Sequence, residues 1–254
     1  RIQQISIALG ENYMIPKIIH YCWFGGREKP LEIKMCIDSW KRYMPEYEIR
    51  EWNEGNFNIE NYVYAKEAYE MKKWAFVSDV VRLAVLYRYG GIYLDVDVEF
   101  VKPLPQYFLE YDAFCGFEYT MTVAPGLIFG VVKSHPFVKN ILDSYTNEHF
   151  YLPKDGMYQT INLRITEALT KQGLKKNNEF QNVNGIRVFP SEYFCGYDTD
   201  IREPLITDKT ICWHHYLGTW QKLSVKGRFQ NILKGIIGIN NYKKVLYFIR
   251  KKRK

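Results

Sequence analysis

Residues 78–98, which read SDVVRLAVLYRYGGIYLDVDV, join an apolar helix to a short strand through a pair of glycines. Apolar residues recur there with helical spacing at Val80, Val81, Leu83, Ala84, Leu86 and Tyr87. Ser78 is suited to cap the start of this helix, and Gly90 with Gly91 is suited to end it in a tight turn. The segment therefore predicts a buried helix that leads directly into a strand, which is typical of an α/β fold.

Two carboxylates, Asp95 and Asp97, stand one residue apart at the end of this strand. Alternate residues of an extended strand point to the same face, so we expect both acids and Tyr93 on one face. Val96 and Val98 then point into the core. Paired oxygen ligands on one face are a common way to hold Mg²⁺ or Mn²⁺ together with a phosphorylated ligand, so the pattern predicts a metal site.

Asp79 and Arg82 lie three residues apart and therefore share one edge of the helix. A charged pair on an otherwise apolar helix needs a partner or a ligand. One interpretation is a structural ion pair that ties the helix to the sheet. The other, favoured by the D-x-D that follows, places the pair beside a phosphate site.

Strand-like and helix-like segments alternate along the rest of the chain. We expect strands at 17–24, 47–52, 113–118, 126–132 and 187–190, and helices at 31–43, 60–72 and 158–172. Such alternation predicts a mostly parallel central sheet flanked by helices. Ligands of these sheets bind beyond the carboxyl ends of the strands, where both Trp23 and the D-x-D are expected.

Three blocks of this chain resemble glycosyltransferase family 32, the DXD-containing group. They are D-x-x-R-x-x-x-L-Y-x-x-G-G-x-Y-x-D-x-D at Asp79 to Asp97, IPKIIHYCWFGG at Ile15 to Gly26, and WHHYLGTW at Trp213 to Trp220. The resemblance implies a GT-A fold. We expect it to occupy residues 1–222, followed by a basic amphipathic extension at 223–254.

The resemblance also implies roles for individual residues. Trp23 is expected to stack on the base of a nucleotide, although a core tryptophan is the alternative. Arg82 is expected to contact the phosphates or the sugar of the donor through its planar guanidinium, with Asp79 either orienting Arg82 or binding a hydroxyl of the donor sugar. Asp95 is expected to meet donor hydroxyls and to assist the metal, while Asp97 ligates the metal directly. The expected donor-binding set is Trp23, Asp79, Arg82, Tyr93 and Asp95.

The closing block WHHYLGTW resembles the H-x-x-x-S-W motif of the family, with threonine in place of serine. This spacing favours His215 over His214 as the further metal ligand. The Thr219 hydroxyl and the Trp220 indole N–H are expected to donate hydrogen bonds to the departing phosphate. Together with Asp95, Asp97 and Arg82, they complete the expected catalytic set.

The resemblance implies a retaining, Mn²⁺- or Mg²⁺-dependent transfer of a hexose from a nucleotide sugar to a saccharide acceptor. We expect a UDP-linked donor first and GDP-mannose second, in bacterial capsular or surface polysaccharide synthesis. Two alternatives remain open, a nucleotidyltransferase that acts on sugar phosphates and a non-catalytic sugar-binding protein. Glycoside hydrolysis is disfavoured because it needs two carboxylates on opposite sides of the scissile bond.

The charge and cysteine patterns bear on location. No acidic residue follows Asp208, while twelve Lys and Arg do, within a chain of net charge +7. A basic helical tail over 241–254 with apolar residues on one side favours binding to an anionic membrane surface over an inert tail or binding to nucleic acid.

The five cysteines lack close pairs, no apolar stretch reaches the length needed to span a membrane, and no signal-peptide pattern is present. We therefore expect a cytoplasmic protein on the inner face of the membrane that extends a lipid-linked acceptor.

Overall fold

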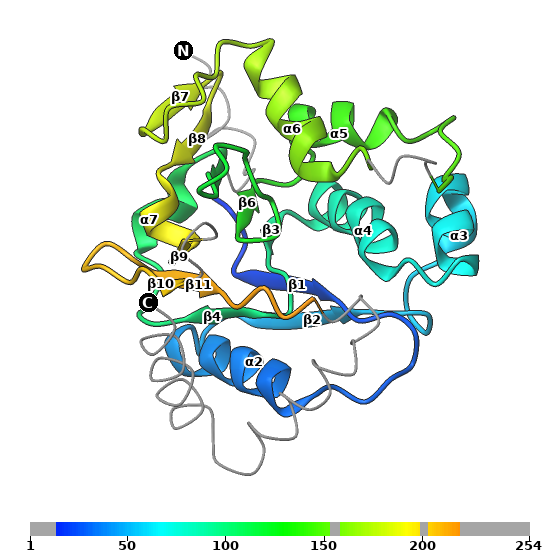
Figure 1. The fold of residues 1–254 in the computed structure, drawn as a ribbon, viewed down its shortest axis with the longest axis horizontal. Helices are drawn as coiled ribbons and strands as arrows, with labels where there is room; N and C mark the ends of the chain where they lie inside the picture. The colour runs from blue at the N-terminus through cyan, green and yellow to red at the C-terminus, as the bar shows by residue number, and fades with distance from the viewer. Residues whose placement is uncertain (1–13, 153–157, 199–202, 219–254) are drawn as a thin grey trace, which may run out of the picture. The chain divides into compact units, whose positions relative to one another are not determined.

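The computed structural model describes residues 14–152, 158–198 and 203–218 (Figure 1). A seven-stranded sheet with the order β2-β1-β3-β6-β5-β8-β7 forms its centre. The strands of this sheet are β1 (Ile18–Cys22), β2 (Glu48–Trp52), β3 (Gly91–Tyr93), β5 (Ala113–Gly116), β6 (Phe129–Val131), β7 (Gln181–Val183) and β8 (Ile186–Phe189). The five strands expected at 17–24, 47–52, 113–118, 126–132 and 187–190 are thus all present, with ends shifted by up to three residues.

The sheet is mainly parallel, as expected. Strands β2, β1, β3, β5 and β8 run in one direction, and only β6 and β7 run against them. Because parallel strands end at the same edge, β1 and β3 bring the segments that follow them, with Trp23 and the D-x-D, to neighbouring positions. The α/β fold predicted from the sequence is confirmed.

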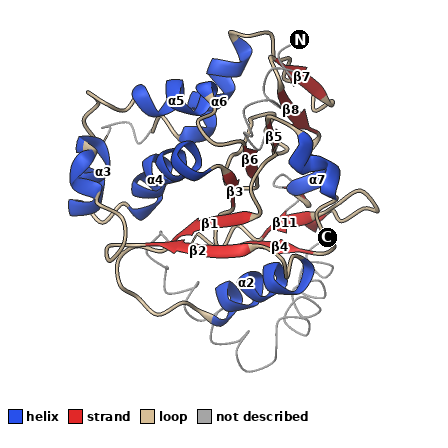
Figure 2. Cartoon of the chain, turned by 180° about the vertical axis from the view of Figure 1, so that it is seen from behind, coloured by secondary structure: helices blue, strands red, loops and turns tan. Residues whose placement is uncertain are grey.

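Helices flank the sheet on both sides, as Figures 1 and 2 show for α2 and α4. The helices are α2 (Leu31–Tyr43), α3 (Val63–Glu70), α4 (Trp74–Tyr89), α5 (Pro136–Asp143), α6 (Ile161–Thr170) and α7 (Ser191–Phe194), with 3₁₀ turns η1 (Ile59–Asn61) and η2 (Gln106–Glu110). Helix α2 covers the residues predicted for it. Its Trp40 donates the indole N–H to the carbonyl oxygen of Val98 at 2.8 Å, which fixes this helix to the segment after the D-x-D.

Helix α4 is buried on every side from Phe76 to Leu86, including its charged residues. It begins at Trp74, four residues before the expected cap. Ser78 therefore lies inside the helix, where its hydroxyl donates to the carbonyl of Ala75 at 2.7 Å, and the predicted capping role is wrong. The expected end at Gly90 is confirmed, because this residue has a φ of 66° that favours glycine.

The D-x-D segment is a turn, not the continuous strand predicted. Strand β3 ends at Tyr93, and β4 (Val98–Phe100) begins a separate ribbon with β11 (Cys212–His214). The backbone N–H of Val98 donates to the carbonyl of Asp95 at 3.1 Å, closing the turn. Strand alternation therefore does not apply to the two acids, and each carboxylate has its own partner.

The remaining ribbon consists of β9 (Tyr197–Asp198) and β10 (Glu203–Pro204). All five cysteines are buried and free of disulfide bonds, as expected. Within residues 14–152, 158–198 and 203–218, no helix has the length and apolar character needed to cross a bilayer. The predicted basic extension at 223–254 lies outside the described residues.

Candidate functional site

A buried ion-pair chain links α4 to the D-x-D turn. One nitrogen of Arg82, Nη2, lies 3.1 Å from Oδ1 of Asp79 and 3.2 Å from Oδ1 of Asp95. The side chains of Arg82 and Asp79 are 5% and 8% exposed, while that of Asp95 is 32% exposed. The helix pair is thus structural, as the first interpretation predicted, and it also holds the first acid of the D-x-D.

The expected direct contact of Arg82 with the donor does not fit this burial. Its Nε also donates to the carbonyl of Ser78 at 3.2 Å, and its guanidinium carbon lies 4.4 Å from the centre of the Tyr93 ring. The guanidinium therefore faces protein on several sides. Tyr93 was expected to contact the donor, but it is only 1% exposed. Its ring instead packs against the guanidinium of Arg82 as a cation–π partner.

Burial and neighbouring charges shift the pKa values of Arg82 and Asp79 in opposite directions. Burial disfavours the charged form of Arg82, but the negative charges of Asp95 and Asp79 prevail and raise the pKa of its guanidinium. Burial raises the pKa of Asp79 to about 6, against the opposing charge of Arg82. Arg82 therefore stays positively charged. Its charge attracts the partly exposed carboxylate of Asp95 and holds it in place.

Gly126 makes room for Asp95. Its carbonyl accepts a hydrogen bond from the Asp95 backbone N–H at 2.8 Å. A Cβ at position 126 would overlap Oδ2 of Asp95 and lie 3.2 Å from Nη1 of Arg82. The backbone of residue 126 therefore approaches the carboxylate more closely than any side chain permits, a constraint that the sequence did not reveal.

The second acid, Asp97, faces His214 at the end of β11. The Nε2 of His214 lies 3.1 Å from Oδ1 of Asp97, and both side chains are nearly buried, at 12% and 10% exposure. Burial lowers the pKa of His214, but the charges of Asp97, Asp95 and Glu118 outweigh it and raise the pKa overall. One imidazole nitrogen and one carboxylate thus meet beside the turn.

His215, the histidine favoured from the sequence, points elsewhere. Its Nε2 lies 2.7 Å from Oε2 of Glu99, and its ring centre lies 3.8 Å from that of Trp213. Successive side chains of a strand point to opposite faces, so Trp213 and His215 share one face and His214 takes the other. The contact with Asp97 therefore belongs to His214. Thr219 and Trp220 lie outside the described residues.

Trp23 lies in the turn after β1 and is partly exposed. Its indole N–H donates to the carbonyl of Arg27 at 2.6 Å, and the Lys29 ammonium lies 5.5 Å from the ring centre. Gly25 follows with a φ of 93°, and a Cβ there would lie 2.8 Å from the ring of Trp74. The indole is thus oriented by its own turn and is not a core residue, which leaves the stacking role open.

Glu118 joins the site although the sequence did not single it out. Its carboxylate accepts hydrogen bonds from Thr122 at 2.6 Å, from Asn162 at 3.1 Å and from the hydroxyl of Tyr216 at 3.3 Å. Its charge contributes to the raised pKa of His214. The available signal was its position just after β5, at the edge of the sheet where ligands bind.

Two side chains among the described residues carry atoms of the kind that bind metal ions. None of the described parts of the chain brings three or more His, Cys, Asp or Glu side chains together to hold a metal ion. Asp97 and His214 offer one oxygen and one nitrogen donor in contact with each other. The Asp97 carboxylate suits Mn²⁺ or Mg²⁺, whereas an imidazole nitrogen is more typical of sites for metals such as Zn²⁺ or Fe²⁺. One or two protein ligands suffice when substrate phosphates complete the coordination. The donor set therefore fits a metal that binds together with a diphosphate.

Residues 30–114, which include α4 and the D-x-D turn, match the sequence family described as a glycosyltransferase sugar-binding region containing a DXD motif. This part of the chain is therefore similar to the sugar-binding region of DXD glycosyltransferases. The resemblance inferred from the sequence motifs is confirmed in this part of the chain.

Relatives of this DXD glycosyltransferase region support the assignment. The chain is 33% identical over 159 residues to inositol phosphoceramide mannosyltransferase 3 of Schizosaccharomyces pombe, covering 57% of this chain and 42% of that protein. It is 26% identical over 218 residues to the uncharacterized glycosyltransferase L373 of Acanthamoeba polyphaga mimivirus, covering 82% and 84%. The chain thus spans less than half the length of the yeast enzyme.

The fold of the DXD region is that of a solved glycosyltransferase. The PaToxG glycosyltransferase superposes with a TM-score of 0.50 at 22% identity, over 63% of this chain and 70% of that one. At this identity the likeness concerns the fold alone. It confirms the expected GT-A architecture.

Proposed function

We propose that this protein is a metal-dependent glycosyltransferase that moves a hexose from a nucleotide sugar to a saccharide acceptor with retention of configuration. The contact between Asp97 and His214 carries the proposal, because it sets two metal donors beside the ion-pair chain that positions Asp95. The match of residues 30–114 to the DXD glycosyltransferase region supports the same conclusion.

The chemistry explains why these groups are needed. Breaking the bond between the anomeric carbon and the diphosphate leaves negative charge on the phosphate. A divalent metal supplies Lewis-acid stabilisation of that charge. The protein contributes positioning and fixed charge, and neither requires a nucleophile at this site.

Each residue has a distinct part in the proposal. Asp97 and His214 hold the metal. Asp95, one-third exposed and fixed by Arg82, accepts hydrogen bonds from donor hydroxyls. Arg82 acts through Asp95 and is a positioning residue, and Asp79 in turn holds Arg82.

Several other residues complete the proposed site. Trp23 stacks on the nucleotide base. Glu118 lies on the acceptor side, beside the start of α6. Thr219 and Trp220 donate hydrogen bonds to the departing phosphate, as the closing motif indicates.

A UDP-linked hexose is the proposed donor because the turn at Trp23 to Gly26 resembles the W-x-G-G of the large clostridial glucosylating toxins. GDP-mannose is the competing donor, supported by the mannosyltransferase name of the yeast relative. The proposed acceptor is a capsular or surface saccharide. Binding of the basic segment at 223–254 to the inner membrane face would bring the protein to a lipid-linked form of that acceptor. Flotation with liposomes that contain anionic lipid, with and without residues 241–254, tests that location.

A donor panel tests the function. The protein is incubated with Mn²⁺ and one of four donors, UDP-glucose, UDP-galactose, UDP-N-acetylglucosamine or GDP-mannose, and release of the nucleoside diphosphate is measured. We expect one donor to release its nucleoside diphosphate, and we expect this release to stop when a chelator removes the metal. Asp97→Asn should abolish the release, whereas Asp38→Asn, the same change at an exposed acid of α2, should leave it intact.

The two alternative functions give different products. Pyrophosphate released from a nucleoside triphosphate and a sugar phosphate would indicate a nucleotidyltransferase. Binding of a sugar without any nucleotide product would indicate a non-catalytic sugar-binding protein. Either result contradicts the proposed transfer reaction.

A further inference from the structure

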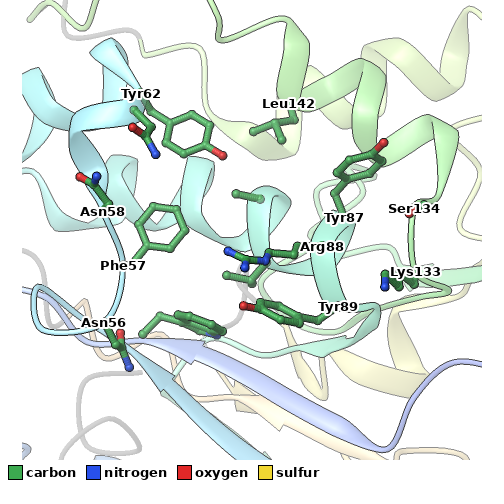
Figure 3. A pocket seen from close by; sticks show the side chains of 14 residues that line it. Asn56, Phe57, Asn58, Tyr62, Tyr87, Arg88, Tyr89, Lys133, Ser134 and Leu142 are labelled. Atoms are coloured by element: carbon green, nitrogen blue, oxygen red, sulfur yellow. The ribbon is translucent and has the colours of Figure 1, made fainter.

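A pocket lies away from the D-x-D turn, between the carboxyl-terminal half of α4, the loop after β2 and the turn η1 (Figure 3). Its volume is about 510 Å³. Pockets for small ligands commonly measure roughly 300–1,000 Å³, so this one has the capacity for a sugar unit with its substituents. The residues proposed above for the donor do not line it.

The pocket and the ion pairs of Arg82 lie on different faces of α4. Arg88 lines the pocket and lies six residues after Arg82. At 3.6 residues per turn and 1.5 Å per residue, six residues correspond to about 9 Å along the axis and a rotation of about 240°. The two arginines therefore serve different surfaces of α4.

Aromatic rings form much of the pocket wall. Trp52 and Tyr89 stack with ring centres 5.6 Å apart, and Phe57 and Tyr62 stack at 5.8 Å. Figure 3 shows Phe57, Tyr62, Tyr87 and Tyr89 arranged around the guanidinium of Arg88. Rings fixed in this way present rigid apolar faces with polar hydroxyl groups at their edges, which suits a ligand with both apolar and polar faces.

The charged side chains that line the pocket are all positive. Arg88 and Lys133 line it, and no aspartate or glutamate does. Both cations are exposed, and neither forms an ion pair with another residue in the described parts of the chain. The Arg88 guanidinium carbon lies 5.1 Å from the centre of the Tyr89 ring, which holds it over the wall of the pocket. Two such cations favour an anionic ligand.

Amide groups complete the lining. Asn56, Asn58 and Asn61 lie along one side, from the loop after β2 to η1. Asn58 uses its Oδ1 to accept a hydrogen bond from the backbone N–H of Glu60, so its side chain is held in place. Amides both donate and accept hydrogen bonds and thus match the hydroxyl groups of a sugar.

We propose that this pocket binds a saccharide unit that carries a negative charge, as a carboxylate or a phosphate. The saccharide part of the inference rests on the proposed transferase function, and the charge preference rests on the pocket alone. The site would hold a charged unit of the acceptor chain or of its product, separately from the sugar being transferred.

Calorimetric titration of the full chain tests the proposal. The probes are a tetrasaccharide of alternating glucuronic acid and N-acetylglucosamine, and neutral chitotetraose. We expect the acidic probe to bind at least about tenfold more tightly than the neutral one, because only the former pairs with Arg88 and Lys133. Glucose 6-phosphate and glucuronic acid, used as competitors, distinguish a phosphate from a carboxylate as the preferred group.

Variants locate the binding. Arg88→Gln combined with Lys133→Gln should weaken binding of the acidic probe about tenfold or more, and Phe57→Ala should weaken it as well. Lys176→Gln, the same change at an exposed lysine far along the chain, should have no effect. Unchanged thermal unfolding shows that each variant is folded.

The result is independent of the transfer reaction. Asp97→Asn should bind the acidic probe like the natural sequence even though it loses nucleotide release. Absence of binding, equal binding of the neutral probe, or wild-type binding by the double variant would overturn the proposal. Binding of UDP in this pocket, lost in the double variant, would mark a nucleotide site and overturn it too.

Discussion

His214 Nε2 lies 3.1 Å from Oδ1 of Asp97, so the last strand of the described chain meets the D-x-D turn at the second acid. The register of β11 on β4, in which His214 pairs with Val98, produces this contact. Two segments more than a hundred residues apart in the chain thereby supply neighbouring donors. The proposed metal site depends on this pairing.

The two adjacent histidines should differ in their effect on activity. His214→Gln removes a proposed metal donor and should lower metal-dependent turnover by about 10- to 100-fold. His215→Gln removes the hydrogen bond to Glu99 and the ring contact with Trp213, and it should stay within about threefold of the natural sequence. Initial rates across a Mn²⁺ titration measure both. A larger loss for His215→Gln would restore the histidine favoured by the sequence motif and contradict the geometry.

Arg82 should matter for stability as well as activity. Arg82→Gln leaves Asp79, 8% exposed, without its charged partner and should lower the free energy of unfolding by about 3–5 kcal/mol. Arg50→Gln is the matched control, because Arg50 pairs with Glu48 at an exposed edge and should cost less than about 1 kcal/mol. Urea unfolding measures both values. An equal loss of unfolding free energy in the two variants would show that the buried ion pairs of Arg82 stabilise the fold no more than an exposed pair does.

Gly126 should be intolerant of even a methyl group. In Gly126→Ala the new Cβ overlaps Oδ2 of Asp95 and must displace that carboxylate. We expect turnover to fall about tenfold or more, with an unfolding free energy lower by about 1–3 kcal/mol. Gly55→Ala is the control, since its Cβ meets only the Asn53 side chain at 3.2 Å. Full turnover in Gly126→Ala would mean that Asp95 is not positioned in the way proposed.

His20 should make stability depend on pH. It is fully buried, accepts a hydrogen bond from the Trp52 indole at 3.0 Å and donates to the Gly90 carbonyl at 2.9 Å, so it must be neutral. Burial lowers its pKa to about 4 from 6.5. The unfolded chain therefore binds the proton more readily, and stability is present above pH 6.5 and lost as the pH falls towards 4.

The difference between the natural chain and His20→Gln isolates this effect. The free energy of unfolding of the natural chain should fall by about 3 kcal/mol more than that of the variant between pH 7 and pH 4. Urea titrations at several pH values measure the difference. Parallel pH profiles for the two proteins would show that His20 does not titrate in this way.

Local patterns predicted much of the fold. The helical period of 80–87 and the glycines after it placed α4 and its end, and the three-residue spacing placed Asp79 beside Arg82. These features depend on residues close together in the chain. The start of α4 was predicted too late because Trp74 to Val77 continue the helix without a side-chain cap.

Long-range pairing decided what the sequence did not predict. The D-x-D looks like the end of a strand, but β4 leaves the central sheet to pair with β11, so a turn forms at Asp95 to Asp97. The same pairing aims His214 and not His215 at Asp97. Gly126 and Glu118 reach the site through the loop between β5 and β6, and no local motif marks either residue.

The central claim is that the Asp97 carboxylate holds the divalent ion that the donor diphosphate needs. Electron paramagnetic resonance of Mn²⁺, titrated with protein in the presence of UDP, tests it most directly, because bound Mn²⁺ loses the signal of the free ion. The account predicts that the natural chain and Asp38→Asn deplete the free signal, while Asp97→Asn leaves it at the level set by UDP alone. Undiminished Mn²⁺ binding by Asp97→Asn would contradict the account.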